Sequence, residues 1–129
     1  MRGRNRFAKG FTLIELMIVL AILAIIMAVA VPAYQSQVRH SRRSEAMQLL
    51  SGCALQQERF RADNPQYGNI ACASTTTNYT IAISNVTATT FTYTATAQGD
   101  QTHDQQEGTS CTPLTINQAR TKTPAVCWK

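Results

Sequence analysis

Gly10 and Glu15 are the residues near the N-terminus whose types and spacing could support chemistry. Glu15 opens an apolar stretch that has no strongly polar side chain from Leu16 to Val31. A charge inside a membrane-spanning segment costs roughly 2.5 to 3.5 kcal/mol, so it is normally retained only where a partner neutralises it. A cut after Gly10 would create a new amino group at Phe11, which an apolar environment would pair with a carboxylate.

The stretch that positions Glu15 is long enough to cross a membrane. A helix from residue 11 to residue 31 would extend about 31 Å at 1.5 Å per residue, which matches the hydrocarbon core of a bilayer. Its N-terminal flank carries Arg2, Arg4, Arg6 and Lys9 and no acid, so the N-terminus should stay cytoplasmic. A secretory signal has a shorter apolar core and small residues after it. We therefore expect a cleaved basic leader at 1–10 and a transmembrane or filament-core helix at 11–32.

The run Gly10-Phe11-Thr12-Leu13-Ile14-Glu15 followed by an apolar helix resembles the class III signal of type IV pilins and pseudopilins. The resemblance implies that prepilin peptidase cuts between Gly10 and Phe11 and N-methylates Phe11. It also implies that Glu15 serves assembly by pairing with Phe11 of a neighbouring subunit. Pro32 resembles the pilin proline that kinks the helix, whereas Ala24 departs from the glycine that many members have.

The implied fold class is α+β, the type IV pilin fold, with a long N-terminal helix packed on a small antiparallel β-sheet. The transmembrane half of the helix should continue as an amphipathic half over residues 33–62 and end at Asp63. Apolar residues dominate one face only beyond Glu45, so we expect the head to begin there. Before Glu45 nearly the same face carries three arginines, Arg39, Arg42 and Arg43, with His40 beside them in the sequence. Such a group suits DNA phosphates, but we expect it to face headgroups or neighbouring subunits instead.

Residues 63–129 are predicted to form a disulfide-stapled β-sheet head. Period-two alternation predicts strands over 79–83 and 91–95 joined by a turn at 85–89, and a third strand over 113–117. Residues 68–77 and 98–110 are small or polar, and we expect them to be connecting loops.

Four cysteines lie beyond the membrane segment, on the oxidising side, and indicate two disulfides. Of the three possible connectivities we favour Cys53 with Cys72 and Cys111 with Cys127. The second would close a loop of about 17 residues, worth roughly 3 kcal/mol in the chain-entropy model. A zinc site is not expected, because there is no C-x-x-C pair and no nearby histidine.

Catalysis is not supported, since the chain has two histidines and no nucleophile with a base at motif spacing. Asp100, Asp104 and Glu107 lie in a loop of the kind that holds calcium in some pseudopilins, but their spacing matches no EF-hand. We expect no enzyme, no metal and no cofactor. The formal charge of +5 falls to +1 without the four cations of the leader, so composition is poor evidence for a nucleic-acid partner.

The stretch from Cys111 to Trp128 resembles minor pilins of the PilE type, and we expect Trp128 to pack over the disulfide and cover the sheet edge. The resemblance implies a structural pilus subunit, a minor pilin that enters or primes the filament for motility, adhesion or DNA uptake. A major pilin and a pseudopilin of a type II secretion system are the alternatives. The implied partners are other pilin subunits, prepilin peptidase and the assembly platform of the inner membrane.

Before assembly the chain would cross the inner membrane once, with its head in the periplasm, and afterwards it would lie in an extracellular pilus. A hypothesis of another class is a membrane-tethered periplasmic binding module that never polymerises. That module would need no cleavage after Gly10 and would tolerate the loss of the Glu15 carboxylate.

Overall fold

A computed structural model describes residues 10–72 and 76–129 of the 129-residue chain. The chain divides into two compact units, which adjoin in sequence at Gln35 and Ser36. Helix α1 (Leu13–Asp63) contributes its N-terminal part to the first unit and its C-terminal part to the second.

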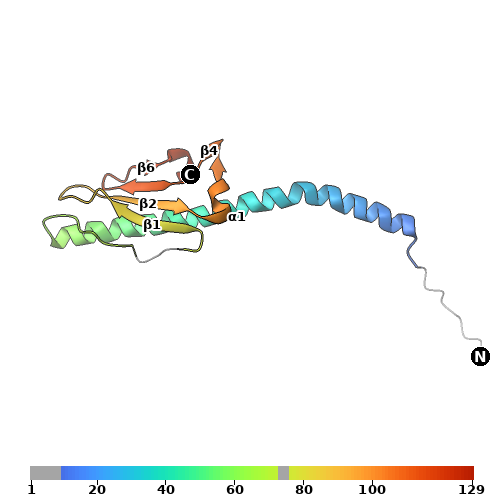
Figure 1. The fold of residues 1–129 in the computed structure, drawn as a ribbon, viewed down its shortest axis with the longest axis horizontal. Helices are drawn as coiled ribbons and strands as arrows, with labels where there is room; N and C mark the ends of the chain where they lie inside the picture. The colour runs from blue at the N-terminus through green and yellow to red at the C-terminus, as the bar shows by residue number, and fades with distance from the viewer. Residues whose placement is uncertain (1–9, 73–75) are drawn as a thin grey trace, which may run out of the picture. The chain divides into compact units, whose positions relative to one another are not determined.

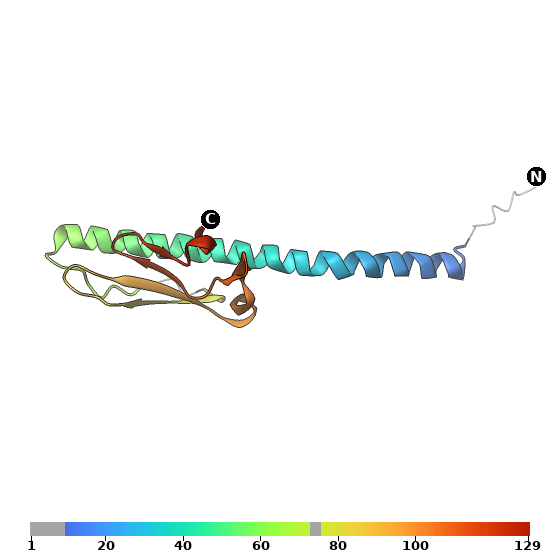
Figure 2. The same ribbon diagram turned by 90° about the horizontal axis from the view of Figure 1, so that it is seen from above.

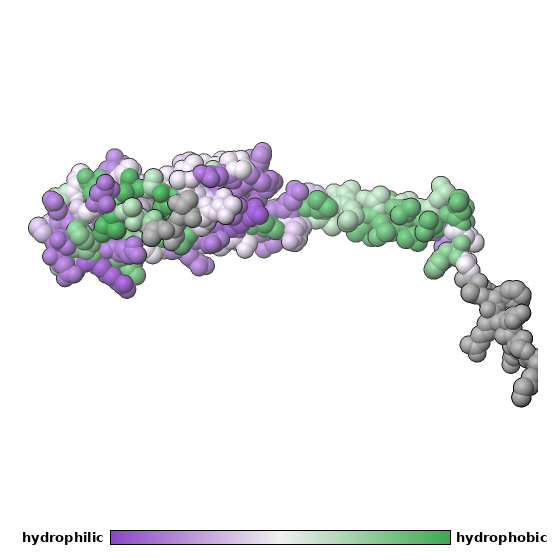
Figure 3. Space-filling view, turned by 60° about the horizontal axis from the view of Figure 1, so that its bottom comes forward, coloured by the Kyte–Doolittle hydropathy of each residue, from purple (hydrophilic) through white to green (hydrophobic). Residues whose placement is uncertain are grey.

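The first unit is the apolar part of α1. The helix begins at Leu13, two residues later than expected, because Thr12 acts as its N-cap and its Oγ1 accepts the Glu15 N–H at 3.2 Å. Glu15 lies in the first turn, where the helix dipole favours a carboxylate. The helix continues through Pro32, and an 18-residue window with a mean hydropathy of 3.0 makes it apolar and long enough to cross a membrane. Its large apolar side chains are exposed and form a continuous surface (Figure 3).

The second unit is the head, in which the remainder of α1 lies along a four-stranded antiparallel sheet (Figures 1 and 2). The strands are β1 (Tyr79–Ser84), β2 (Thr92–Ala97), β5 (Leu114–Asn117) and β6 (Lys122–Thr123), in the order β1-β2-β5-β6. The predicted α+β class, three strands and C-terminal end of the helix are confirmed.

The sheet buries alternate side chains against α1, as the period-two pattern predicted. Tyr93, Ala95 and Leu114 are fully buried and pack with Ala46 and Leu50 of the helix in one apolar core. The opposite face of β2 carries threonines, which a pleated, solvent-facing surface favours.

The segment 98–110, expected to be a loop, contains three short elements. These are the 3-10 helix η1 (Gly99–His103) and the hairpin of β3 (Gln105–Gln106) with β4 (Thr109–Ser110). The hairpin forms because Glu107 and Gly108 both have positive φ, 51° and 76°, which is the backbone of a tight primed turn. A further 3-10 helix, η2 (Ala125–Trp128), follows β6.

The prediction that the head begins near Glu45 is wrong. Arg39 and Arg43 both bond to side chains of the head, and burial on α1 begins before Glu45. The helix face looks cationic in sequence because its partners are carboxylates far along the chain.

Candidate functional site

The Gly10–Phe11 bond, the expected cleavage point, lies outside α1, whose first residue is Leu13. Phe11 is largely exposed, and the Glu15 carboxylate follows it within the first helical turn. This places a short non-helical segment before a capped helix. Such a segment is the kind of backbone that a peptidase can take into its site, because no helical hydrogen bonds have to be broken.

Two of the three arginines in the cationic group of α1 bond to other side chains of the head. Arg39 donates two hydrogen bonds to Asp100, from Nε at 2.9 Å and from Nη2 at 2.7 Å. Arg43 lies one turn further along α1, and its Nη1 donates to both oxygens of Asp104 at 3.1 Å. The two arginines and the two aspartates are each four residues apart, so the helix and the η1 segment are joined by two parallel ion pairs.

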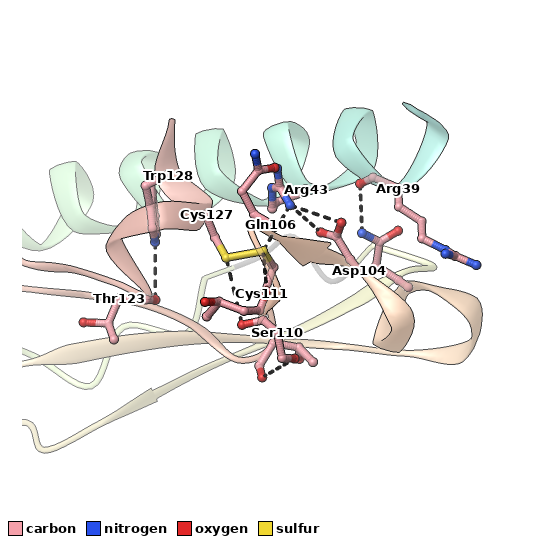
Figure 4. Close-up of a disulfide and its surroundings, with 12 residues drawn as sticks. Arg39, Arg43, Asp104, Gln106, Ser110, Cys111, Thr123, Cys127 and Trp128 are labelled. Carbon is pink, nitrogen blue, oxygen red and sulfur yellow. Dashed lines mark hydrogen bonds and ion pairs between the residues drawn. A yellow bond between two sulfur atoms is a disulfide. The ribbon is translucent and has the colours of Figure 1, made fainter. Parts of the chain in front are cut away.

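Arg43 is also the residue that connects α1 to the C-terminal disulfide (Figure 4). Its Nη2 donates to Gln106 Oε1 at 2.8 Å, and its Nη1 lies 3.1 Å from Cys111 Sγ. The side chains of Arg43 and Asp104 are 1% and 5% exposed. A guanidinium this deeply buried is tolerated only with its partners in place, so it is a structural group and not a free cation.

Hydrogen bonding and burial shift the pKa values of several groups near these ion pairs. The hydrogen bonds from Arg39 lower the pKa of Asp100, and the same bonds raise the pKa of Arg39. Burial raises the pKa of Tyr79, whose hydroxyl accepts a hydrogen bond from Gln101 at 3.0 Å. Asp100 and Asp104 are thus held by arginines. Among the residues that the structure describes, no group of three His, Cys, Asp or Glu side chains could hold a metal ion.

The cysteines form the two favoured pairs, Cys53 with Cys72 and Cys111 with Cys127, each with a Cα–Cα distance of 5.6 Å. The first fixes the segment after α1 to the helix itself. The second encloses β5, β6 and the turn between them. This enclosed segment carries two exposed cations, Arg120 and Lys122. Among the described residues of the head outside α1, they are the two cations that lie nearest to each other in the sequence.

The turn that carries Arg120 has an unusual backbone. Arg120 has a φ of 57°. This is the left-handed region of the backbone, which glycine and asparagine adopt more readily than arginine. Asn117 stabilises it, because its carbonyl accepts the Arg120 N–H at 2.9 Å and its side-chain Oδ1 accepts the Thr121 N–H at 2.9 Å.

Lys122 lies on the edge strand β6 beside the last turn of the chain. Its Nζ is 4.9 Å from the centroid of the Trp128 ring, a cation–π distance. The Trp128 Nε1 donates to the Thr123 carbonyl at 3.3 Å, so the indole covers the sheet edge as expected. Lys122 also borders two hollows between α1 and the sheet, of about 320 and 410 Å³. Both hollows include Ser51, and Arg120 lines the first.

Sequence reasoning did not single out Arg120, Lys122 or Asn117. The two cations are separated by one residue in a polar segment, and nothing in the local pattern marks them. The available signal was the pair of cysteines on either side, which predicts a constrained loop but not its charge.

A small α+β head on an apolar N-terminal helix that starts after a Gly-Phe junction defines a type IV pilin. Residues 5–31 match the motif described as "Prokaryotic N-terminal methylation motif". Residues 32–115 match the family described as "Type IV minor pilin ComP, DNA uptake sequence receptor", and since the match covers most of the chain, the protein belongs to this family. Pilins are structural subunits and not enzymes.

The chain is similar to several curated pilins over part of its length. It is 61% identical over 44 residues to the fimbrial protein EcpC of Eikenella corrodens and 56% identical over 48 residues to the type IV major pilin protein PilE1 of Neisseria gonorrhoeae. These matches cover 34% and 37% of this chain, and 29% of each relative's length. Since PilE1 is described as a major pilin, the minor-pilin assignment comes from the ComP family match.

The fold has a counterpart of known structure. A type IV pilin from Shewanella oneidensis superposes with a TM-score of 0.61, covering 70% of this chain and 98% of that one at 22% identity. At this identity the likeness concerns the fold alone.

Proposed function

We propose that this protein is a minor pilin whose head binds DNA at the surface of a type IV pilus. The support is the family match over residues 32–115, which include almost all of β1 to β5. From the sequence, the cationic residues of α1 were expected to face headgroups or neighbouring subunits and not DNA. The family match favours DNA binding, and the structure offers a different set of cations for it.

The observation that carries the proposal is the uneven pairing of charges in the head. Residues 36–129 contain eight Lys and Arg and six Asp and Glu, a net charge of +2. At the end where α1 meets η1, which we call the base, Arg39, Arg43 and Lys129 form ion pairs with carboxylates. The charge of the base is therefore largely neutralised.

The opposite end of the head, which we call the loop end, carries the excess positive charge. The β1–β2 connection and the β5–β6 turn both lie there, since Thr92 is opposite Asn117 and the Phe91 N–H donates to Gln118. The last turns of α1 adjoin them, because Glu58 and Arg120 line one hollow. Four cations, Arg59, Arg61, Arg120 and Lys122, lie in this region with two acids, Glu58 and Asp63.

Within residues 10–72 and 76–129, the four cations of the loop end form no ion pair with a carboxylate. Cations that are not neutralised by the protein attract the phosphate backbone and release its counterions. The loop end is thus the interface that we assign to DNA.

The assembly cycle follows from the N-terminal part. We propose that prepilin peptidase cuts between Gly10 and Phe11 and methylates Phe11 while the chain crosses the inner membrane once with the head in the periplasm. The assembly platform then moves the apolar helix into the core of a pilus made with other pilin subunits. Membrane insertion followed by location in a pilus is typical of the family.

The test is DNA binding by the full-length chain in detergent, measured by fluorescence anisotropy with a labelled DNA duplex over a range of salt concentrations. We expect Arg120→Gln to weaken binding and to reduce the slope of log affinity against log salt by about 1, because one phosphate contact is lost. The matched control is Arg42→Gln, which removes an equal charge at the base. Failure of the wild-type chain to bind DNA would refute the proposal, and equal losses in the two variants would place the interface elsewhere.

A further inference from the structure

Trp128 is a half-buried tryptophan close to the C-terminus that sequence analysis assigned only to packing. Its ring donates a hydrogen bond from Nε1 to the Thr123 carbonyl at 3.3 Å, and the backbone before it is held by Cys127, which is fully buried and bonded to Cys111. Figure 4 shows the indole directed toward the edge strand beside the disulfide. Such a ring presents a fixed aromatic face to whatever lies against it.

What lies against that face is the ammonium of Lys122, 4.9 Å from the ring centroid. A lysine on an edge strand normally samples many rotamers, and holding it still for a ligand costs up to about 2 kcal/mol of side-chain entropy. A cation–π contact restricts those rotamers before a ligand arrives while the ammonium keeps its charge and its donors.

We infer that Trp128 is a positioning residue that preorganises Lys122 for a phosphate of the DNA backbone; the inference rests on the proposed function. Trp128 does not contact DNA in this arrangement. It acts through Lys122, which borders both hollows between α1 and the sheet and is two residues from Arg120. The disulfide Cys111–Cys127 contributes by fixing the segment to which Trp128 belongs.

The disulfide-enclosed segment therefore fixes its two cations in different ways. Arg120 is fixed by its backbone, through the hydrogen bonds to Asn117, and Lys122 is fixed by its side chain, through the aromatic ring. Both arrangements lower the entropy cost of binding without adding a contact to the ligand, which is how preorganisation increases affinity.

The experiment measures binding of a labelled DNA duplex to the full-length chain in detergent, comparing wild type, Trp128→Leu, Trp128→Phe, Lys122→Gln and the double variant Trp128→Leu/Lys122→Gln. We expect Trp128→Leu to weaken binding by about two- to fivefold, the range of an exposed cation–π contact. Trp128→Phe keeps an aromatic face and should retain most of the affinity. In the Lys122→Gln background, Trp128→Leu should have no further effect.

The double variant separates positioning from packing. A general structural role of Trp128 would weaken binding equally with and without Lys122, and that result would overturn the inference. So would an unchanged affinity of Trp128→Leu, or a Trp128→Phe variant as weak as Trp128→Leu. Thermal unfolding of each variant verifies that the head is folded.

The two proposals fail differently. If the wild-type chain binds no DNA, the proposed function and the inference are both refuted. If the wild-type chain and the Arg120→Gln variant behave as expected but the Trp128 variants bind like wild type, only the inference is refuted.

Discussion

Arg39 and Arg43 make the same kind of contact in different surroundings. Each guanidinium bonds to an aspartate 61 residues further along the chain. The Asp100 side chain is 56% exposed, whereas that of Asp104 is 5% exposed. Water screens the first pair and not the second, so the two aspartates should differ greatly in what they contribute to stability.

We therefore expect Asp104→Asn to destabilise the head by about 3 to 5 kcal/mol, because it leaves the buried Arg43 without its charge partner. Asp100→Asn is the matched control, because it makes the same chemical change in the neighbouring Arg39–Asp100 pair. It should lower the stability of the head much less. Urea unfolding of the full-length chain in detergent measures both. Equal costs would mean that burial does not separate the two pairs.

Asp100 also predicts a dependence on pH. Its carboxyl has an ordinary pKa of 3.8, and the hydrogen bonds from Arg39 lower the pKa in the folded state. The pair thus stabilises the head above pH 3.8, and the stabilisation is lost as the pH falls through the lower folded pKa. The melting temperature of wild type should exceed that of Asp100→Asn at neutral pH, converge with it in acid, and approach it in high salt. A difference that persists in strong acid would contradict this origin.

The sequence shows that these four residues are charged, but it does not show which arginine bonds to which aspartate. Arg39 and Arg43 are four residues apart, as are Asp100 and Asp104, and this matched spacing was visible before the structure. It could not be used because η1 was expected to be an irregular loop. A pair of charges separated by 61 residues becomes predictable only when both elements and their register are known.

At the scale of elements, the segment after α1 is attached to the helix by one buried amide as well as by the first disulfide. The Gln57 side chain is fully buried, and its Nε2 donates to the Gly68 carbonyl and to the Tyr93 hydroxyl while its Oε1 accepts the Gly68 N–H. Gly68 itself fits because a Cβ there would lie 2.8 Å from a carbon of the Phe60 ring. One glutamine thus joins the helix, the following segment and the sheet.

We expect Gln57→Leu to destabilise the head by about 1 to 3 kcal/mol, since it removes hydrogen-bond partners from the partly buried backbone of Gly68 and from the buried Tyr93 hydroxyl. The adjacent Gln56 is exposed, and Gln56→Leu should change stability by less than about 0.5 kcal/mol. Urea unfolding compares the two variants. If Gln56→Leu costs as much as Gln57→Leu, the hydrogen bonds to Gly68 and Tyr93 are not what the amide contributes.

The longer elements were predictable, and the short ones were not. The six-residue strand β2 buries every second side chain, and β1 places Tyr79, Ile81 and Ile83 on the face that packs against the core. The two-residue strands β3, β4 and β6 are too short to show any period. They depend on particular turns, such as the one made by Glu107 and Gly108. Two of the four cations of the loop end, Arg120 and Lys122, lie on one of these short elements and the turn before it, and this is why sequence reasoning missed these two.

At the scale of the whole molecule, the described residues combine an apolar segment whose side chains are exposed within their own unit and a head with a buried core. The large side chains from Phe11 to Val31 are exposed, whereas the head buries its core between α1 and the sheet. An exposed apolar surface of this length needs a bilayer or other subunits to cover it. Glu15 is the one charge within this segment, and its loss tests how the subunit enters a filament.

We expect Glu15→Ala to leave processing intact and to abolish incorporation into pili, because the variant lacks the carboxylate that neutralises the Phe11 ammonium of a neighbour. Glu45→Ala is the control, since it removes an exposed acid of the head and should be incorporated normally. Mass spectrometry of sheared filaments and of membranes measures the amount and the N-terminus of each chain. If the Glu15→Ala chain has an N-methylated Phe11 but is found only in membranes, the result supports charge pairing between Glu15 and the Phe11 ammonium of a neighbour. Normal incorporation of Glu15→Ala would refute charge pairing. An uncut leader in the wild-type chain would refute the proposed cleavage between Gly10 and Phe11, because the Phe11 ammonium that Glu15 is expected to neutralise would then not exist.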